Sequence, residues 1–215
     1  MPNLRSQAKR FDHLVDWALE NGAHRASIIS PSIICVEERV QMKCLIPRCT
    51  SYGKSLTCPP NLPGPAEVAQ MVSEYEVALM LQVVGDEETD GAEPGMGDDY
   101  NWVYPSVYRL HEILHHLERT AMDMGCYLAM GLGGGDCRWC EMLREGEADD
   151  CKLHASAGGC PGADTGKCVR DYRARPALEG MSINVIKTAD NAGMPFEFTG
   201  KTEGYVTWNG IVLLE

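Results

Sequence analysis

The spacing of apolar residues along the chain predicts three helices, each with one apolar face. Apolar side chains recur every three or four residues over 4–20, and the Asn21-Gly22 pair then ends the run as a C-cap signal. A shorter helix of the same kind is expected over 66–75. The longest helix is predicted over 105–124, where the apolar positions again fall on one face.

Almost continuous apolar runs of strand length flank the longest helix. They are VALMLQVV at 77–84 and CYLAMGL at 126–132, and such runs are typical of strands that are covered on both faces. A strand, a helix and a strand in this order favour a parallel pair joined by a right-handed crossover. We therefore expect an α/β fold, with a parallel or mixed sheet flanked by helices. Further strands are expected at 26–30, 33–40, 181–187 and 204–214.

The segment that follows the predicted strand at 126–132 is rich in glycine and cysteine. It reads GLGGGDCRWC from Gly131, and ligands commonly lie beyond the carboxyl ends of such strands. Two residues separate Cys137 from Cys140, so one metal ion or cluster can take both thiolates. The glycines before them can bring bare backbone N–H groups to an anionic centre. Five cysteines compete for four ligand positions, which leaves the ligand set open: Cys137, Cys140, Cys151, Cys160 and Cys168.

A second group of cysteines lies upstream, in and before an irregular loop. A metal centre would fix the loop KCLIPRCTSYGKSLTCPPNLPGP, because nothing else in its sequence offsets the entropy cost of ordering it. The Cys58-Pro59 step resembles the Cys-Pro step that closes bacterial ferredoxin motifs. Cys35 precedes the loop in an apolar stretch, where it is either a further ligand or a small buried hydrophobe. The candidate ligands of this group are Cys35, Cys44, Cys49 and Cys58.

Length and composition favour a reducing compartment for these thiols. The chain has 215 residues with ten cysteines, which suits a single α/β domain (1–215) with a cysteine-rich insertion at about 133–170. No secretory signal is visible near the N-terminus, and no apolar run approaches the ~18 residues of a membrane helix. We therefore expect a cytoplasmic protein with no membrane partner, in which clustered thiols hold metal or do redox chemistry. A disulfide-bonded exported protein is the alternative.

The net charge bears on the partners. A formal charge of −12 argues against a nucleic-acid partner, since phosphate binding depends on Lys and Arg. Two basic residues nevertheless lie near candidate ligands. Lys54 either neutralises cluster charge, meets an anionic substrate or is a solvated loop residue. Arg175 either contacts an acidic cofactor or a partner's carboxylates, or belongs to a surface helix.

The spacing of the cysteines favours iron–sulfur clusters over structural zinc. Zinc sites built from four cysteines usually pair two short Cys-x2-4-Cys knuckles. This chain has one tight pair, Cys137 and Cys140, and its other intervals are irregular. The chain also has more cysteines than one zinc site requires. Zinc therefore stays the alternative metal.

The predicted helix at 105–124 contains a literal match to the zinc-protease motif H-E-x-x-H, from His111 to His115. A zinc protease would also require a third ligand downstream and a substrate cleft. Ile113 and Leu114 fit the core face of the helix, so we expect the histidines to lean toward solvent. The cysteines point to a different metal chemistry.

Two blocks of residues resemble a known family. The first contains Cys44, Cys49, Tyr52-Gly53-Lys54 and Cys58-Pro59-Pro60, and the second contains Gly131, Cys137-x2-Cys140, Cys168, Arg175-Pro176 and Glu179-Gly180. They resemble the domain-of-unknown-function family of "predicted metal-binding proteins", which is frequent in anaerobic bacteria and methanogens. The resemblance covers about residues 30–200 and implies a cysteine-bound metal centre, iron–sulfur in type, in a cytoplasmic protein of an anaerobe. The chain has Leu143 where the family continues Cys-x2-Cys-x2-Cys, and 144–167 looks like an insertion that supplies Cys151 and Cys160.

The cysteine pattern and the resemblance together lead to a functional hypothesis. We expect an iron–sulfur protein with one or two [4Fe–4S] clusters that serves electron transfer or the activation of a partner enzyme. Its partner would be a redox protein or that enzyme. A second hypothesis is an enzyme in which a cluster with three thiolate ligands leaves one iron open to a substrate or sulfide. A third is a zinc-stabilised interaction module. No residue in the sequence identifies a substrate.

Overall fold

The computed structural model describes residues 9–85, 104–137, 139–142, 160–170, 173–196 and 206–215. Its strands are β1 (Arg25–Ile29), β2 (Val77–Gly85), β3 (Met130–Gly133) and β4 (Val206–Leu214). They form one sheet in the order β1-β2-β4-β3, and each neighbouring pair is antiparallel. β4 comes after the other three strands in the chain, yet it lies inside the sheet between β2 and β3.

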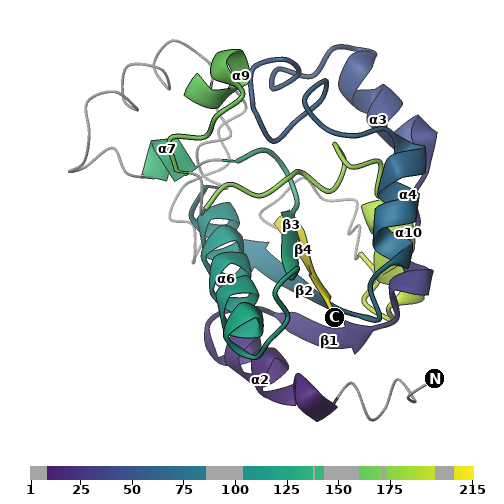
Figure 1. Cartoon of the computed structure of the whole chain (residues 1–215), viewed down its shortest axis with the longest axis vertical. Helices are drawn as coiled ribbons and strands as arrows, with labels where there is room; N and C mark the ends of the chain where they lie inside the picture. The colour runs from purple at the N-terminus through teal and green to yellow at the C-terminus, as the bar shows by residue number, and fades with distance from the viewer. Residues whose placement is uncertain (1–8, 86–103, 138, 143–159, 171–172, 197–205) are drawn as a thin grey trace.

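Both faces of the sheet are covered, which explains the nearly continuous apolar run of β2. Alternate side chains point to opposite faces, so Leu79 and Leu81 belong to one core and Ala78 and Met80 to the other. The first core packs against α2 (Asp12–Glu20) and α6 (Tyr104–Asp123), and the second against α4 (Pro65–Ser73) and α10 (Val185–Asn191). Figure 1 shows these two layers on either side of the strands.

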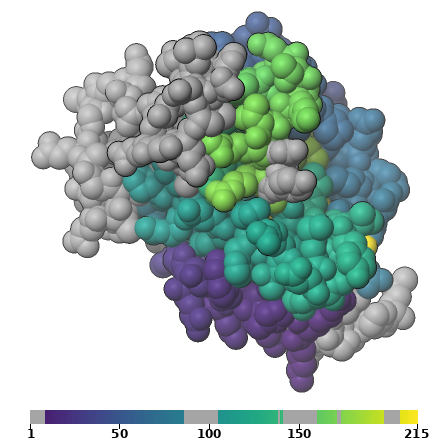
Figure 2. Space-filling view, turned by 60° about the vertical axis from the view of Figure 1, so that its left-hand side comes forward, coloured from purple at the N-terminus to yellow at the C-terminus, as the bar shows by residue number. Residues whose placement is uncertain are grey.

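The three predicted helices are confirmed within the described residues, as α2, α4 and α6. α6 is the longest, and Leu110, Leu114 and Leu117 on its apolar face are fully buried. Figure 2 shows α6 in teal, with the N-terminal helix α2 in purple beneath it and the segment after residue 160 in green above. No described helix is both long enough and apolar enough to cross a membrane.

The expected parallel pairing of the strands on either side of α6 is wrong. β2 and β3 do run in the same direction, because each is antiparallel to β4. They are not neighbours, since β4 pairs with β2 along all nine of its residues and occupies the place between them. β4, which is distant in sequence, therefore separates β2 from β3, the two strands that the local order of elements predicts as neighbours. The sheet is antiparallel and neither parallel nor mixed, although Gly133 also makes one isolated parallel bridge with Ala177.

Two predicted strands are wrong, and a third is shorter than expected. The segment 33–40 is split between η1 (Pro31–Ile33) and the helix α3 (Glu38–Leu45), and 181–187 runs into α10. These two segments meet through a single bridge between Val36 and Ile183, which is too little pairing to extend into strands. The run at 126–132 contributes only β3 to the sheet, because its first residues form a turn.

Candidate metal centre

Three of the predicted ligands line one cavity of about 910 Å³ at the end of β3. Cys44, Cys49 and Cys58 lie on one wall. The turn that follows β3, from Gly134 to Asp136, also lines the cavity. This turn must be made of glycine because the chain passes very close to β4. The amide of Gly134 donates to the Asn209 carbonyl oxygen at 2.8 Å, and a Cβ there would lie 3.0 Å from that oxygen.

The loop that carries the first group is held by its own backbone. Cys44 lies in the last turn of α3, and its carbonyl oxygen accepts from the amide of Cys49 at 2.9 Å. The amide of Gly53 donates to the carbonyl oxygen of Pro59 at 2.9 Å, and Gly53 has a φ of +71° that favours glycine. The loop therefore has internal order without a metal, which the sequence did not indicate.

Four of the five cysteines in the second group are described, and Cys151 lies outside the described residues. Cys140 belongs to α7 (Trp139–Met142), and Cys160 precedes α9 (Pro161–Thr165) as its N-cap residue. Cys168 follows α9, and its sulfur accepts from the amide of Arg170 at 3.2 Å. Cys137 lies close enough to Cys160 and Cys168 for their charges to affect its pKa.

The two cysteine groups lie side by side in the structure, although they are far apart in the sequence. The amide of Cys160 donates to the carbonyl oxygen of Lys54 at 2.7 Å. The amide of Cys137 donates to the Thr57 hydroxyl at 3.3 Å, and the Ser51 hydroxyl donates to the Asp136 carboxylate at 2.8 Å. In Figure 1 the loop after α3 passes between α3 and α9 at one end of the molecule. The structure thus brings the two predicted sites together.

Burial raises the pKa of three of these thiols, those of Cys58, Cys137 and Cys44. It raises the pKa of Cys58 to about 12, and the nearby Asp136 carboxylate adds to the shift. It also raises the pKa of Cys137 to about 12 and that of Cys44 above its ordinary value. No three His, Cys, Asp or Glu side chains among the described residues converge closely enough to hold a metal ion as they stand. Metal binding by these thiols requires them to lose their protons.

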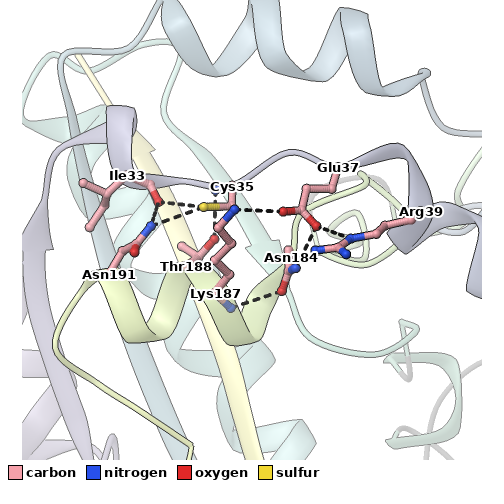
Figure 3. A network of polar contacts seen from close by, with 8 residues as sticks. All are labelled: Ile33, Cys35, Glu37, Arg39, Asn184, Lys187, Thr188 and Asn191. Atoms are coloured by element: carbon pink, nitrogen blue, oxygen red, sulfur yellow. Dashed lines mark hydrogen bonds and ion pairs between the residues drawn. The ribbon is translucent and has the colours of Figure 1, made fainter.

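Cys35 lies apart from the cavity, in a polar network between η1 and α10 (Figure 3). Its amide donates to the Thr188 hydroxyl at 3.0 Å, and the Asn191 side chain donates to its sulfur at 3.2 Å. In the same network the Glu37 carboxylate accepts from Asn184 at 2.9 Å. The structure therefore does not bring Cys35 together with the other three cysteines of its group.

The two predicted anion contacts have different surroundings. The Lys54 side chain is exposed and does not line the cavity. Arg175 is buried, and its Nε lies 2.6 Å from the Glu118 carboxylate. Glu118 also accepts from the amide of Gly131 at 2.5 Å. Arg175 thus binds a carboxylate of its own chain, and the same carboxylate joins α6 to β3.

The histidine motif on α6 has a structural place. His111 is 1% exposed, so the expectation that it leans toward solvent is wrong. Its ring packs against Gly133, where an added Cβ would lie 3.0 Å from its Cε1. The Nδ1 atom of His115 is 3.5 Å from an Arg175 nitrogen, and a cation so close opposes the binding of a metal cation. This geometry gives no support to a protease.

The glycine amides that we expected to face an anionic centre are bonded within the protein. Gly133 donates to the Pro176 carbonyl oxygen at 3.1 Å, and Gly134 to Asn209. Gly135 donates to the Glu179 carboxylate at 3.2 Å. The glycines therefore hold the turn beside the cavity in place.

Two carboxylates at the cavity were missed by the sequence reasoning. Asp136 and Glu179 both line it, and burial raises the pKa of Glu179. Asp136 directly precedes Cys137, so its position in the motif was a usable signal. Glu179 has no ligand spacing to any cysteine, and only the fold brings it to the cavity.

Comparisons with known proteins agree with the cysteine pattern. A family model described as "Predicted metal-binding protein (DUF2284)" matches residues 27–214, which include both cysteine groups. No similar protein was found among curated proteins, and none among solved structures.

Proposed function

Since this chain belongs to the DUF2284 family of predicted metal-binding proteins, we propose that its cysteines hold iron–sulfur clusters. The observation that carries this proposal is the cavity that Cys44, Cys49 and Cys58 share, with the second cysteine group packed against the same loop. Thiolates are the ligands that such clusters take. The metal that the family binds is not specified by its description, so the choice of iron rests on the number and spacing of the cysteines.

The donor set fits a soft metal centre. Buried thiols with a pKa of about 12, such as Cys58 and Cys137, ionise at neutral pH only when positive charge is brought to them, and bound metal supplies that charge. The first cluster would be held by Cys44, Cys49 and Cys58. The second would take four thiolates from Cys137, Cys140, Cys151, Cys160 and Cys168. When bound, such clusters supply one-electron transfer.

Electron transfer, or the activation of a partner enzyme by electron transfer, is the function that this arrangement supports best. The direct hydrogen bonds between the two cysteine groups would keep two clusters close together, so that an electron can pass from one cluster to the other. The residues that join them, Ser51, Thr57 and Asp136, lie between the two groups and would fix their separation. A redox protein or a partner enzyme would then exchange electrons with the pair.

The cavity favours a second candidate function. Cys35 lies elsewhere, so three thiols from the first group reach the cavity. A [4Fe–4S] cluster held by three thiolates has one iron without a protein ligand, and such an iron acts as a Lewis acid toward a small molecule. A cavity of about 910 Å³ has the size of a small-molecule site. The protein would in that case be an enzyme.

Metal analysis of anaerobically purified and reconstituted protein tests the proposal. About eight irons and eight sulfides per chain, with a cluster absorption spectrum, would support two [4Fe–4S] sites. About four of each would support one. Zinc in stoichiometric amount, with no iron taken up on reconstitution, would overturn the proposal and indicate a zinc-stabilised interaction module. A small-molecule ligand that changes the spectrum of the iron-loaded protein would favour the enzyme.

A further inference from the structure

The helix α3 and the loop behind it present apolar side chains to solvent. α3 buries none of its residues. Met42, Leu45 and Ile46 follow one another along its end and are 45%, 38% and 65% exposed. Single exposed apolar residues are ordinary, whereas a group of them marks an interaction site.

The same segment has a charge opposite to that of the whole protein. The chain carries a formal charge of −12, yet residues 39–54 contain no Asp or Glu. Their basic residues are Arg39, Lys43, Arg48 and Lys54, and all four are exposed. Arg39 pairs with Glu37 at 2.6 Å, so Lys43, Arg48 and Lys54 supply most of the positive charge. We call residues 39–54 the α3 surface.

The α3 surface also contains Cys49, the one exposed cysteine among the described residues. Cys44 is partly exposed. Arg39 and Lys43 line the same cavity as these thiols, so positive charge lies at its rim. Any molecule that covers Met42 and Lys43 would therefore come close to the first cysteine group.

We infer that the α3 surface docks a small acidic electron-carrier protein, and this inference rests on the proposed function. Exposed aliphatic side chains would form the apolar centre of the interface, and the basic residues its rim. Complementary charge speeds association and sets orientation at such interfaces. One electron would pass from the reduced carrier to the centre beside Cys49, so that the carrier is oxidised and the centre reduced.

A protein fits this surface better than a nucleic acid or a small anion. Nucleic-acid sites combine basic residues with aromatic rings on which bases stack, and the one aromatic side chain of the α3 surface, Tyr52, lies under the Arg48 guanidinium at 5.1 Å. A small anion would have no contact with Met42 or Ile46, so it would leave the apolar part of the surface unexplained.

Binding of acidic carriers to the iron-loaded protein tests the inference. The probes are a small acidic [2Fe–2S] ferredoxin and an acidic flavodoxin, each fluorescently labelled, with a basic c-type cytochrome as the probe of opposite charge. Anisotropy would be followed at ionic strengths of about 0.01 M and about 1 M, where the Debye length is about 30 Å and about 3 Å. Stopped-flow absorbance would give the rate of electron transfer from each reduced carrier.

Matched variants separate the parts of the surface. Lys43→Glu and Arg48→Glu each should slow association with an acidic carrier by about tenfold at low ionic strength, and have little effect at high ionic strength. Lys9→Glu changes the net charge equally at an exposed position on another element, and should have no effect. Met42→Ser should weaken binding at both ionic strengths, whereas Met122→Ser, at a comparably exposed methionine of α6, should not.

The outcomes distinguish this inference from the proposed function. If the protein holds its clusters but neither acidic carrier binds, or if Lys9→Glu acts as strongly as Lys43→Glu, the docking inference is overturned and the proposed function stands. If the protein takes up no iron, both fail. The inference would also be overturned if a labelled single-stranded oligonucleotide binds the protein, fails to bind the Arg48→Glu variant, and neither carrier binds. That result would assign the surface to nucleic acid.

Discussion

The backbone amide of Cys160 lies 2.7 Å from the carbonyl oxygen of Lys54 and donates a hydrogen bond to it. Cys160 belongs to the second cysteine group, and Lys54 lies in the loop that carries the first. This bond therefore joins the two loops. A backbone bond of this kind does not depend on either side chain. The two candidate metal sites are therefore coupled mechanically, and a change in one loop reaches the other.

Removal of metal should loosen both loops together. A chelator takes away the charge that allows Cys58 and Cys137 to ionise, so the loops would be held only by the hydrogen bonds within and between them. We expect faster amide exchange in peptides covering 50–60 and 160–168, with little change in β2, measured by hydrogen exchange and mass spectrometry. Exchange that rises in one loop alone would contradict the coupling.

Serine substitutions should separate ligands from structural cysteines. Cys44→Ser, Cys49→Ser and Cys58→Ser each remove a proposed ligand, so we expect loss of most of the iron bound by the first group and of the matching absorbance. Cys35→Ser is the matched control, because its sulfur accepts from Asn191 and lies outside the cavity. It should retain the metal. Iron loss in Cys35→Ser equal to that in Cys44→Ser would make Cys35 a ligand after all.

Removing one charge of the buried Glu118–Arg175 pair should destabilise the protein strongly, whereas replacing both charges together should cost little stability. Glu118→Leu leaves the guanidinium buried without its carboxylate, at side-chain exposures of only 8% and 14% for Arg175 and Glu118, so we expect a loss of about 3–5 kcal/mol in the free energy of unfolding. Denaturant unfolding measures this loss. Burial raises the pKa of Glu118 even beside Arg175, which shows how strongly desolvation opposes the pair.

The double variant tests the same argument. Glu118→Leu/Arg175→Met replaces both charges with apolar side chains of similar size, and it should recover most of the stability lost in Glu118→Leu. If the double variant is as unstable as Glu118→Leu, the attraction between the two charges exceeds the cost of removing them from water.

His116 should make the protein less stable in mild acid. Its ring stacks on Trp17 at 3.6 Å between centroids, and burial, together with the charge of Arg119, lowers its pKa below 6.5. The unfolded chain therefore takes up a proton first as the pH falls through 6.5, and stability is lost between that pH and the folded pKa. His116→Phe keeps the stacking and should remove this part of the slope, measured by unfolding at a series of pH values. An unchanged slope would contradict it.

Local patterns predicted the helices and the two long strands because their burial is set by neighbours in sequence. α6 has an apolar face with helical spacing, and β2 is apolar at nearly every position because both its faces are covered. The pairing of β2 with β4 depends on contacts between distant segments, so the order of elements along the chain led to a parallel pair instead. Segments with one long-range bridge, such as Val36 with Ile183, have apolar residues but too few partners to become strands.

The candidate site was predictable in its chemistry and less so in its geometry. Cysteine spacing identified Cys44, Cys49 and Cys58 as one group, and they share a cavity. It also suggested Cys35, because distance in sequence does not show that η1 turns this thiol toward α10. The nearness of the two groups, and the presence of Glu179 beside them, depend on tertiary contacts that no spacing rule contains.

The place of β4 in the sheet determines when the site can form during synthesis. Both cysteine groups precede β4 in the chain, so a ribosome makes all the thiols before the strand that completes the sheet. Until β4 inserts, Gly134 lacks the Asn209 carbonyl oxygen to which its amide binds, and the turn beside the thiols lacks this support. The complete cavity therefore forms only after the chain has been translated past Asn209, and a metal that requires the whole cavity would enter only after that point.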